Sequence, residues 1–132
     1  MDSPLTALGT NPYVYFYDED EFEELGPGRR LRIVNGEKLS LWFWRIRPQA
    51  GLSPIHHHDD HEQIGFIARG SLEFSIGDDE TQILGPGSFY LAPPGVPHGG
   101  STFHPDPDLG EIWIIDVFSP PRRAFDDDRS EQ

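Results

Sequence analysis

The chain has 132 residues, enough for one domain with an enclosed core and too few for two conventional ones. It carries 23 acidic residues against 10 Lys and Arg, and this net charge of −13 argues against nucleic acid or an anionic membrane as a partner. Because the chain has no cysteine, disulfides and thiolate chemistry are excluded, and His, carboxylate and amide groups remain as possible metal ligands.

The N-terminal region shows no targeting pattern. It lacks a basic segment followed by an apolar one, and no apolar run approaches the ~20 residues of a membrane helix. We therefore expect a cytoplasmic, soluble protein. Residues 1–17 are predicted to form an arm ending in a strand at Tyr13 to Tyr17, although a frayed terminus would have the same composition. The acidic run from Asp18 to Glu24 is predicted to be a solvated loop.

Short segments with strand character follow, each bounded by Gly, Pro or Asp. They predict strands at Leu31 to Val34, Leu39 to Arg47, Gln63 to Arg69, Ser71 to Ile76, Thr81 to Leu84, Ser88 to Leu91 and Glu111 to Phe118. Because no helical periodicity separates them, the predicted fold class is all-β, a sandwich or barrel of short antiparallel strands over residues 18–123. Residues 124–132 have the composition of an acidic, disordered tail.

One predicted strand is apolar on both sides. Trp42 and Trp44 share one of its faces, and Leu41 and Phe43 lie on the other. Such a strand is buried on both faces or lies at a dimer contact. Core packing is the simplest interpretation of the two tryptophans, and an interface or the wall of a substrate cavity is the alternative.

Four of the six histidines lie in the segment 51–70. His56 and His58 are separated by one residue, so an extended chain places both imidazoles on one face, as two-point metal binding requires. His57 then points to the opposite face and is expected to be exposed. The pair is therefore a candidate for two ligands of one metal ion.

The third ligand is a choice between two neighbours. Gln63 begins the strand that leads to the turn glycine Gly70, so its side chain would approach the metal from that strand. Glu62 is the rival, because a carboxylate is the commoner metal ligand. The spacing to Gly70 favours Gln63, with Glu62 facing outward.

A second cluster covers residues 85–100, GPGSFYLAPPGVPHGG. Its glycines allow tight turns, and its prolines stiffen the loop that is predicted to present His98. A histidine at the end of so rigid a segment is a candidate for a further metal ligand.

These two clusters resemble the two motifs of the cupin superfamily, G-x5-H-x-H-x3,4-E-x6-G and G-x5-P-x-G-x2-H-x3-N. The second motif is matched at full spacing, with Thr102 where Asn is usual, by Gly87, Pro93, Gly95 and His98. The first is matched by His56, His58 and Gly70, with Gly51 one residue closer and Gln63 replacing the glutamate. The resemblance implies a cupin barrel, a jelly roll or double-stranded β-helix. It also implies a homodimer that exchanges N-terminal strands.

A narrower resemblance rests on the run H-x-H-x2-H-E-Q-I and the later segment D-x-F-x3-R. Together they are similar to small single-domain cupins of the pectin-degradation, KdgF-like, type. That resemblance implies one divalent metal ion held by His56, His58, Gln63 and His98. It further implies that Asp116 and Arg122 are catalytic, with Phe118 between them. The reaction it implies converts cyclic unsaturated uronates to linear ketonized products.

The residues themselves agree with these roles. Asp116 lies in an otherwise apolar row with Ile112, Ile114 and Phe118, and desolvation there raises a carboxyl pKa, which suits a general acid or base. A structural Asp bonded to a loop is the alternative. Arg122 has the geometry to clamp a substrate carboxylate, or else pairs with the acidic surface.

Three neutral imidazoles and an amide leave a divalent ion, Zn, Ni, Mn or Fe, with its full charge and an open position. We therefore expect a metal-dependent cupin enzyme that isomerises, opens or cyclises a small carbonyl or hydroxyl compound, with Trp44, Phe118 and Arg122 contacting the substrate. A dioxygenase or polyketide-cyclase-like cupin is one alternative. A non-catalytic, sugar-binding cupin is the other.

Overall fold

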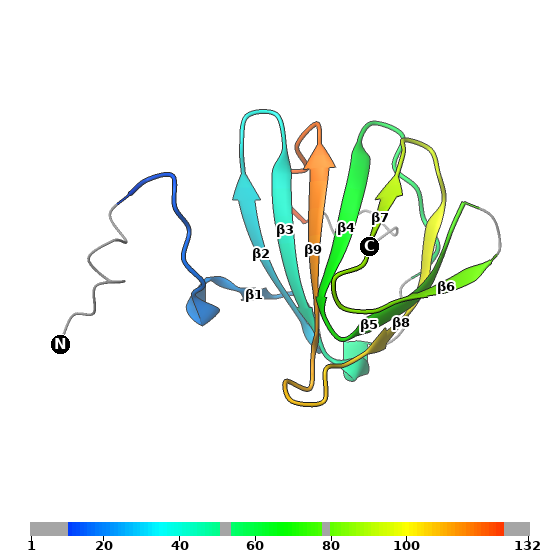
Figure 1. The fold of residues 1–132 in the computed structure, drawn as a ribbon. Coiled ribbons are helices and arrows are strands. Elements are labelled where there is room, and N and C mark those ends of the chain that lie inside the picture. The colour runs from blue at the N-terminus through cyan, green and yellow to red at the C-terminus, as the bar shows by residue number, and fades with distance from the viewer. Residues whose placement is uncertain (1–10, 51–53, 78–79, 126–132) are drawn as a thin grey trace.

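The computed structural model describes residues 11–50, 54–77 and 80–125 (Figure 1). Its regular elements are strands and two 3-10 turns, η1 (Glu19–Glu21) and η2 (Pro48–Ala50), so the predicted all-β class is confirmed. The strands are β1 (Glu23–Glu24), β2 (Arg29–Asn35), β3 (Ser40–Ile46), β4 (Glu62–Arg69), β5 (Ser71–Ile76), β6 (Thr81–Leu84), β7 (Phe89–Ala92), β8 (His98–His104) and β9 (Ile112–Ser119).

The strands form two antiparallel sheets. A six-stranded sheet has the order β1-β2-β3-β9-β4-β7, and a three-stranded sheet has the order β6-β5-β8. Figure 1 shows the sheets converging where β4 turns into β5. Two packed antiparallel sheets of this kind are a jelly-roll arrangement, as expected from the sequence.

The inner faces of the two sheets enclose the core. On β3 the side chains of Trp42 and Trp44 are buried, and they lie opposite Asp116 and Ile114 of β9 in the register of the sheet. Both tryptophans lie in the core, as predicted, and both also line the cavity described below, which was the alternative. The shared inward face of alternate residues on β9 is confirmed. A carboxyl group therefore lies on an apolar inner face, in contact with the core.

Two strands were not predicted, the short β1 and the longer β8. The segment expected to be a loop presenting His98 is instead the beginning of β8, which pairs with β5. Gly99 and Gly100 made this stretch look like a turn, and both do adopt positive φ, 128° and 62°. The strand tolerates them because its pairing with β5 is irregular, with a register shift between Glu73 and Ser75.

The predicted first strand, Tyr13 to Tyr17, is wrong, because this stretch has no strand pairing. Side chains attach it to the sheet instead. Tyr17 stacks on Trp113 with ring centroids 5.7 Å apart, and its hydroxyl accepts a hydrogen bond of 2.9 Å from Arg45. Arg32 donates to the carbonyl of Phe16 at 2.9 Å. Residues 1–10 of the predicted arm lie outside the described residues, and the exchange of 1–17 between subunits stays a prediction.

Two further boundaries differ from those predicted. The acidic run is mostly exposed but contains η1 and β1, and its Phe22 is buried against Phe43. The predicted tail, 124–132, starts too early, because Phe125 packs on the rings of Trp42 and Trp44. Residues 126–132 lie outside the described part. In the described part of the chain no helix is long and apolar enough to cross a bilayer.

Candidate metal centre and adjoining cavity

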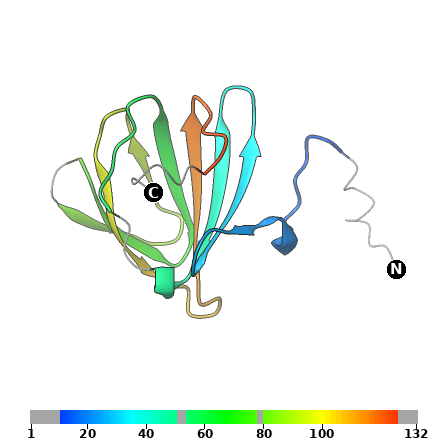
Figure 2. The ribbon, with the colours of Figure 1, turned by 180° about the vertical axis from the view of Figure 1, so that it is seen from behind.

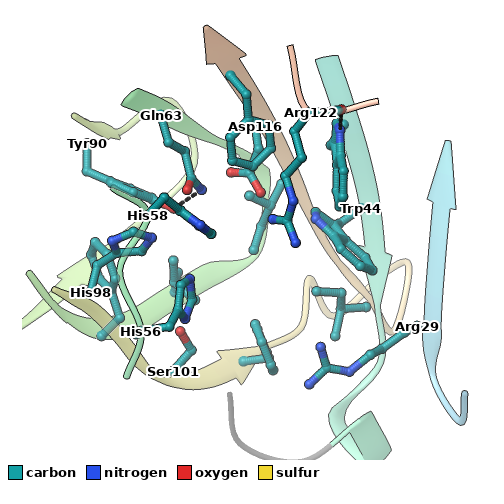
Figure 3. A pocket seen from close by; sticks show the side chains of 18 residues that line it. Arg29, Trp44, His56, His58, Gln63, Tyr90, His98, Ser101, Asp116 and Arg122 are labelled. Atoms are coloured by element: carbon teal, nitrogen blue, oxygen red, sulfur yellow. Dashed lines mark hydrogen bonds between the residues drawn. The ribbon is translucent and has the colours of Figure 1, made fainter. Parts of the chain in front are cut away.

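A cavity of about 80 Å³ lies between the two sheets, with room for several water molecules or part of a small organic ligand. Figure 3 shows the polar side chains that line it: three imidazoles lie together on one side, and the remaining polar groups surround the space beside them. All the site residues predicted from the sequence line this cavity: Trp44, His56, His58, Gln63, His98, Asp116, Phe118 and Arg122.

The two histidine motifs are joined by a pair of backbone hydrogen bonds. His56 N donates to His98 O, and His98 N donates to His56 O, each at 2.7 Å. A side chain at Gly99 would collide with the carbonyl of Pro54, so only glycine lets β8 approach the segment before His56 this closely. Gly99 therefore allows the close backbone approach that brings His56 and His98 together.

The imidazoles of His56, His58 and His98 form a cluster that fits a metal ion. One ring nitrogen from each lies within 4.8 Å of the others. The Nδ1 atoms of His56 and His98 lie 3.0 and 3.1 Å from the carbonyls of Pro54 and Val96, which orients the Nε2 atoms for coordination.

Burial keeps two imidazoles of this cluster neutral, as metal ligands must be, rather than protonated. The Nε2 atoms of His58 and His98 are buried and have no hydrogen-bond partner among the described residues. Burial, aided by neighbouring positive groups, lowers the pKa of His58 to about 3. Burial also lowers the pKa of His98 to about 4, although a bond to the Val96 backbone opposes it. Both imidazoles are therefore neutral at physiological pH, the form that binds a metal. His57 is exposed and bonds Asp59 at 3.0 Å, as its predicted outward orientation requires.

The structure decides between Gln63 and Glu62 as the neighbour of the histidine cluster. Gln63 is buried on the inner face of β4, and Glu62 is exposed on the outer face. The Nε2 atom of Gln63 donates to the hydroxyl of Tyr90 at 2.9 Å, which leaves its Oε1 atom buried without a partner in the described part. The Tyr90 ring lies against Gly65, where any Cβ would collide with it. An amide oxygen held this way is a suitable fourth ligand for the histidine cluster.

Asp116 lies beside Gln63, and burial raises the pKa of its carboxyl to about 7. Hydrogen bonds with Gln63 and Trp44 and the charge of Arg122 act in the opposite direction. The carboxyl exchanges its proton near neutral pH and faces the same cavity as the histidines.

Arg122 is held in place by its backbone and its side chain. After β9 the chain turns back beside β3 (Figure 2), where the Arg122 carbonyl accepts hydrogen bonds of 2.7 Å from Ser40 Oγ and Trp42 Nε1. The guanidinium lies over the Trp42 ring at 4.4 Å and the Phe118 ring at 5.4 Å. This stacking fixes a positive charge at the cavity wall.

Tyr90 and Arg29, which line the cavity, and His61, which lies beside His58, were not singled out from the sequence. Tyr90 lies on the opposite face of β7 from exposed Phe89 and Leu91, so the alternation of that strand could have indicated it. His61 is buried, and its ring lies 4.4 Å from that of His58; the spacing H-x-H-x2-H was its only indication. Arg29 lines the cavity from β2, and nothing in the sequence pattern pointed to it.

The comparisons with known proteins agree with this geometry. Residues 42–107, half of the chain, match the family described as "Cupin domain". The chain belongs to the cupin family. The cupin is 32% identical over 112 residues to the pectin degradation protein KdgF of Dickeya dadantii, which covers 84% of this chain and 96% of that protein.

Other relatives of the cupin support the same assignment. The solved structure of KdgF from a Halomonas species has 28% identity and a TM-score of 0.67, covering 83% of this chain and 96% of that one. The H2HPP isomerase of Bacillus subtilis is 37% identical over 71 residues, 54% of this cupin and 29% of the isomerase. The relatives of this cupin thus include a protein named as an isomerase.

Proposed function

We propose that this cupin is a metal-dependent enzyme that isomerises or opens a small carbonyl acid, with cyclic unsaturated uronates as its first candidate substrates. The observation that carries the proposal is the placement of Asp116. Among the described residues that line the cavity it is the one carboxyl group, and it faces the space between the histidine cluster and Arg122 (Figure 3). The resemblance to KdgF supplies the candidate substrate.

The proposed division of labour follows from the positions of the side chains. His56, His58, His98 and Gln63 would hold a divalent ion, which supplies Lewis-acid polarisation of a substrate oxygen when bound. Asp116 would take a proton from one atom of the substrate and return it to another, since a ketonization moves a proton without changing composition. Arg122 would bind the substrate carboxylate, and Trp44 and Phe118 would exclude water around it.

The test uses metal-loaded protein and an unsaturated uronate monosaccharide, followed by proton NMR. We expect conversion to the linear keto form without oxygen consumption in an oxygen electrode, because an isomerisation has no oxidant. Oxygen uptake coupled to turnover would instead support the dioxygenase, and ligand binding without turnover would support the sugar-binding protein.

The Asp116→Asn variant tests the role of the carboxyl. It keeps the size of the side chain and one acceptor oxygen but cannot move the proton, so we expect a loss of kcat of at least about 10² with metal content unchanged. Asp108→Asn, at an exposed position outside the cavity, is the matched control. Full activity in Asp116→Asn would refute the assigned role.

A further inference from the structure

Arg29 places a second guanidinium in the cavity. It begins β2 opposite Ile46 of β3, and Figure 3 shows its side chain directed into the cavity from the side away from Gln63 and Asp116. The side chain is half-buried, and its guanidinium lies 6.0 Å from the centre of the Phe103 ring. Within the described residues it has no ion pair and no side-chain hydrogen bond.

No carboxylate of the described residues pairs with Arg29, although acidic residues outnumber Lys and Arg by 23 to 10. Arg45, the buried arginine of β3, pairs by comparison with both Glu111 and Glu19. Burial lowers the pKa of Arg29, and no acidic group in the described part of the chain opposes the shift. A desolvated guanidinium without a counter-ion is costly unless a ligand supplies the negative charge.

The charges of the cavity are therefore arranged for more than one anionic group. Its described lining holds two guanidinium groups, Arg29 and Arg122, and one carboxyl, Asp116. A bound divalent ion would add further positive charge on the histidine side. A substrate with a single carboxylate, bound at Arg122, would leave Arg29 without a charged partner.

We propose that Arg29 binds a second anionic group of the substrate, so that the preferred ligand is a small acid with negative groups at both ends. This inference rests on the proposed function, since it assumes that the ligand occupies the cavity with its first carboxylate at Arg122. It narrows the proposed small carbonyl acids to those with two anionic groups, and it ranks a uronate, which has one carboxylate, below them as a ligand. Arg29 is then the specificity-determining residue that separates dianionic from monoanionic acids.

The test compares two keto acids of equal chain length, 2-oxoglutarate and 2-oxopentanoate, which differ in the distal carboxylate. Isothermal titration of zinc-loaded protein should show 2-oxoglutarate binding at least about tenfold more tightly, because a charge-assisted bond to Arg29 is added. In Arg29→Gln the preference should fall to less than about twofold while 2-oxopentanoate binds as before. Arg69→Gln removes the same charge at an exposed position outside the cavity and should keep the preference.

Equal affinity of the wild-type protein for the two acids, no binding of 2-oxoglutarate, or a preference retained in Arg29→Gln would each overturn the inference. These outcomes are separate from the proposed function, which is judged by turnover of the uronate and by Asp116→Asn. Zinc content and melting temperature, measured on every variant, show that the comparison is made between folded, loaded proteins.

Discussion

At the scale of single residues, the site depends on side chains that orient one another. Gln63 presents its amide oxygen because Tyr90 holds the amide nitrogen, and Tyr90 can lie there because Gly65 has no side chain. A glycine in the middle of β4 is thereby linked to the metal site two residues away. Supporting contacts of this kind affect metal affinity almost as strongly as the ligands themselves.

The Gly65→Ala variant tests this chain of contacts. The added methyl group would displace the Tyr90 ring, and the overpacking should lower the free energy of unfolding by about 1–3 kcal/mol. Because Gln63 loses its partner, zinc affinity should fall about tenfold or more. Gly85→Ala is the control, since its Cβ would meet only Ser71 Oγ at 3.9 Å. Wild-type zinc affinity in Gly65→Ala would show that Tyr90 does not position the amide.

At the scale of elements, β3 and β9 are joined by a buried ion pair as well as by their ladder. Arg45 of β3 donates to both carboxylate oxygens of Glu111, which immediately precedes β9, at 2.9 and 3.1 Å. Burial alone would raise the pKa of Glu111, but hydrogen bonds from Arg45 and Trp113 and the charges of Arg45 and Arg47 outweigh it and lower the pKa below its ordinary 4.5. The pair contributes to holding together the two strands that carry Trp44 and Asp116.

The Glu111→Gln variant should therefore destabilise the fold in a pH-dependent way. It leaves the Arg45 charge buried, which should lower the free energy of unfolding at pH 7 by about 3 kcal/mol. Because the folded pKa of Glu111 is depressed, its contribution is present above 4.5 and is lost as pH falls through the folded value. Urea unfolding at several pH values should thus show variant and wild type converging below pH 4.5. Glu73→Gln, at a half-exposed pair with His104, is the control and should change the free energy of unfolding by less than about 1 kcal/mol. A difference between Glu111→Gln and the wild type that stays constant at all pH values would contradict this account.

The elements also show what the sequence could and could not predict. Alternation along β9 was enough to place Asp116 and Phe118 on one inner face, and the spacing to Gly70 was enough to favour Gln63 over Glu62. It failed for β8, because Gly99 and Gly100 adopt turn-like φ inside a strand that the Pro54 backbone approaches. Arg29 could not be found from local pattern at all, since only the pairing of β2 with β3 directs it to the cavity.

At the scale of the whole molecule, the outer face of the six-stranded sheet is apolar and uncovered over β4 and β7. Ile64 and Phe66 of β4 lie beside Leu91 and Phe89 of β7, and these side chains are 45%, 39%, 53% and 69% exposed. The predicted homodimer would bury such an apolar face. The homodimer stays a prediction. Light scattering of the full chain tests it, and a monomeric mass would contradict it.

The whole fold serves to bring residues from distant parts of the chain to one point. His56 and His58 precede β4, Gln63 lies on β4, and His98 begins β8 in the other sheet, yet the three imidazole nitrogens lie within 4.8 Å. The central claim is that this point holds one metal ion.

Metal content by mass spectrometry, on protein loaded with zinc and then desalted, tests that claim most directly. We predict one equivalent per chain in the wild type and in His57→Ala, whose imidazole is exposed, and less than about a tenth of an equivalent in His98→Ala. One equivalent retained in His98→Ala, or none in the wild type, would contradict the site.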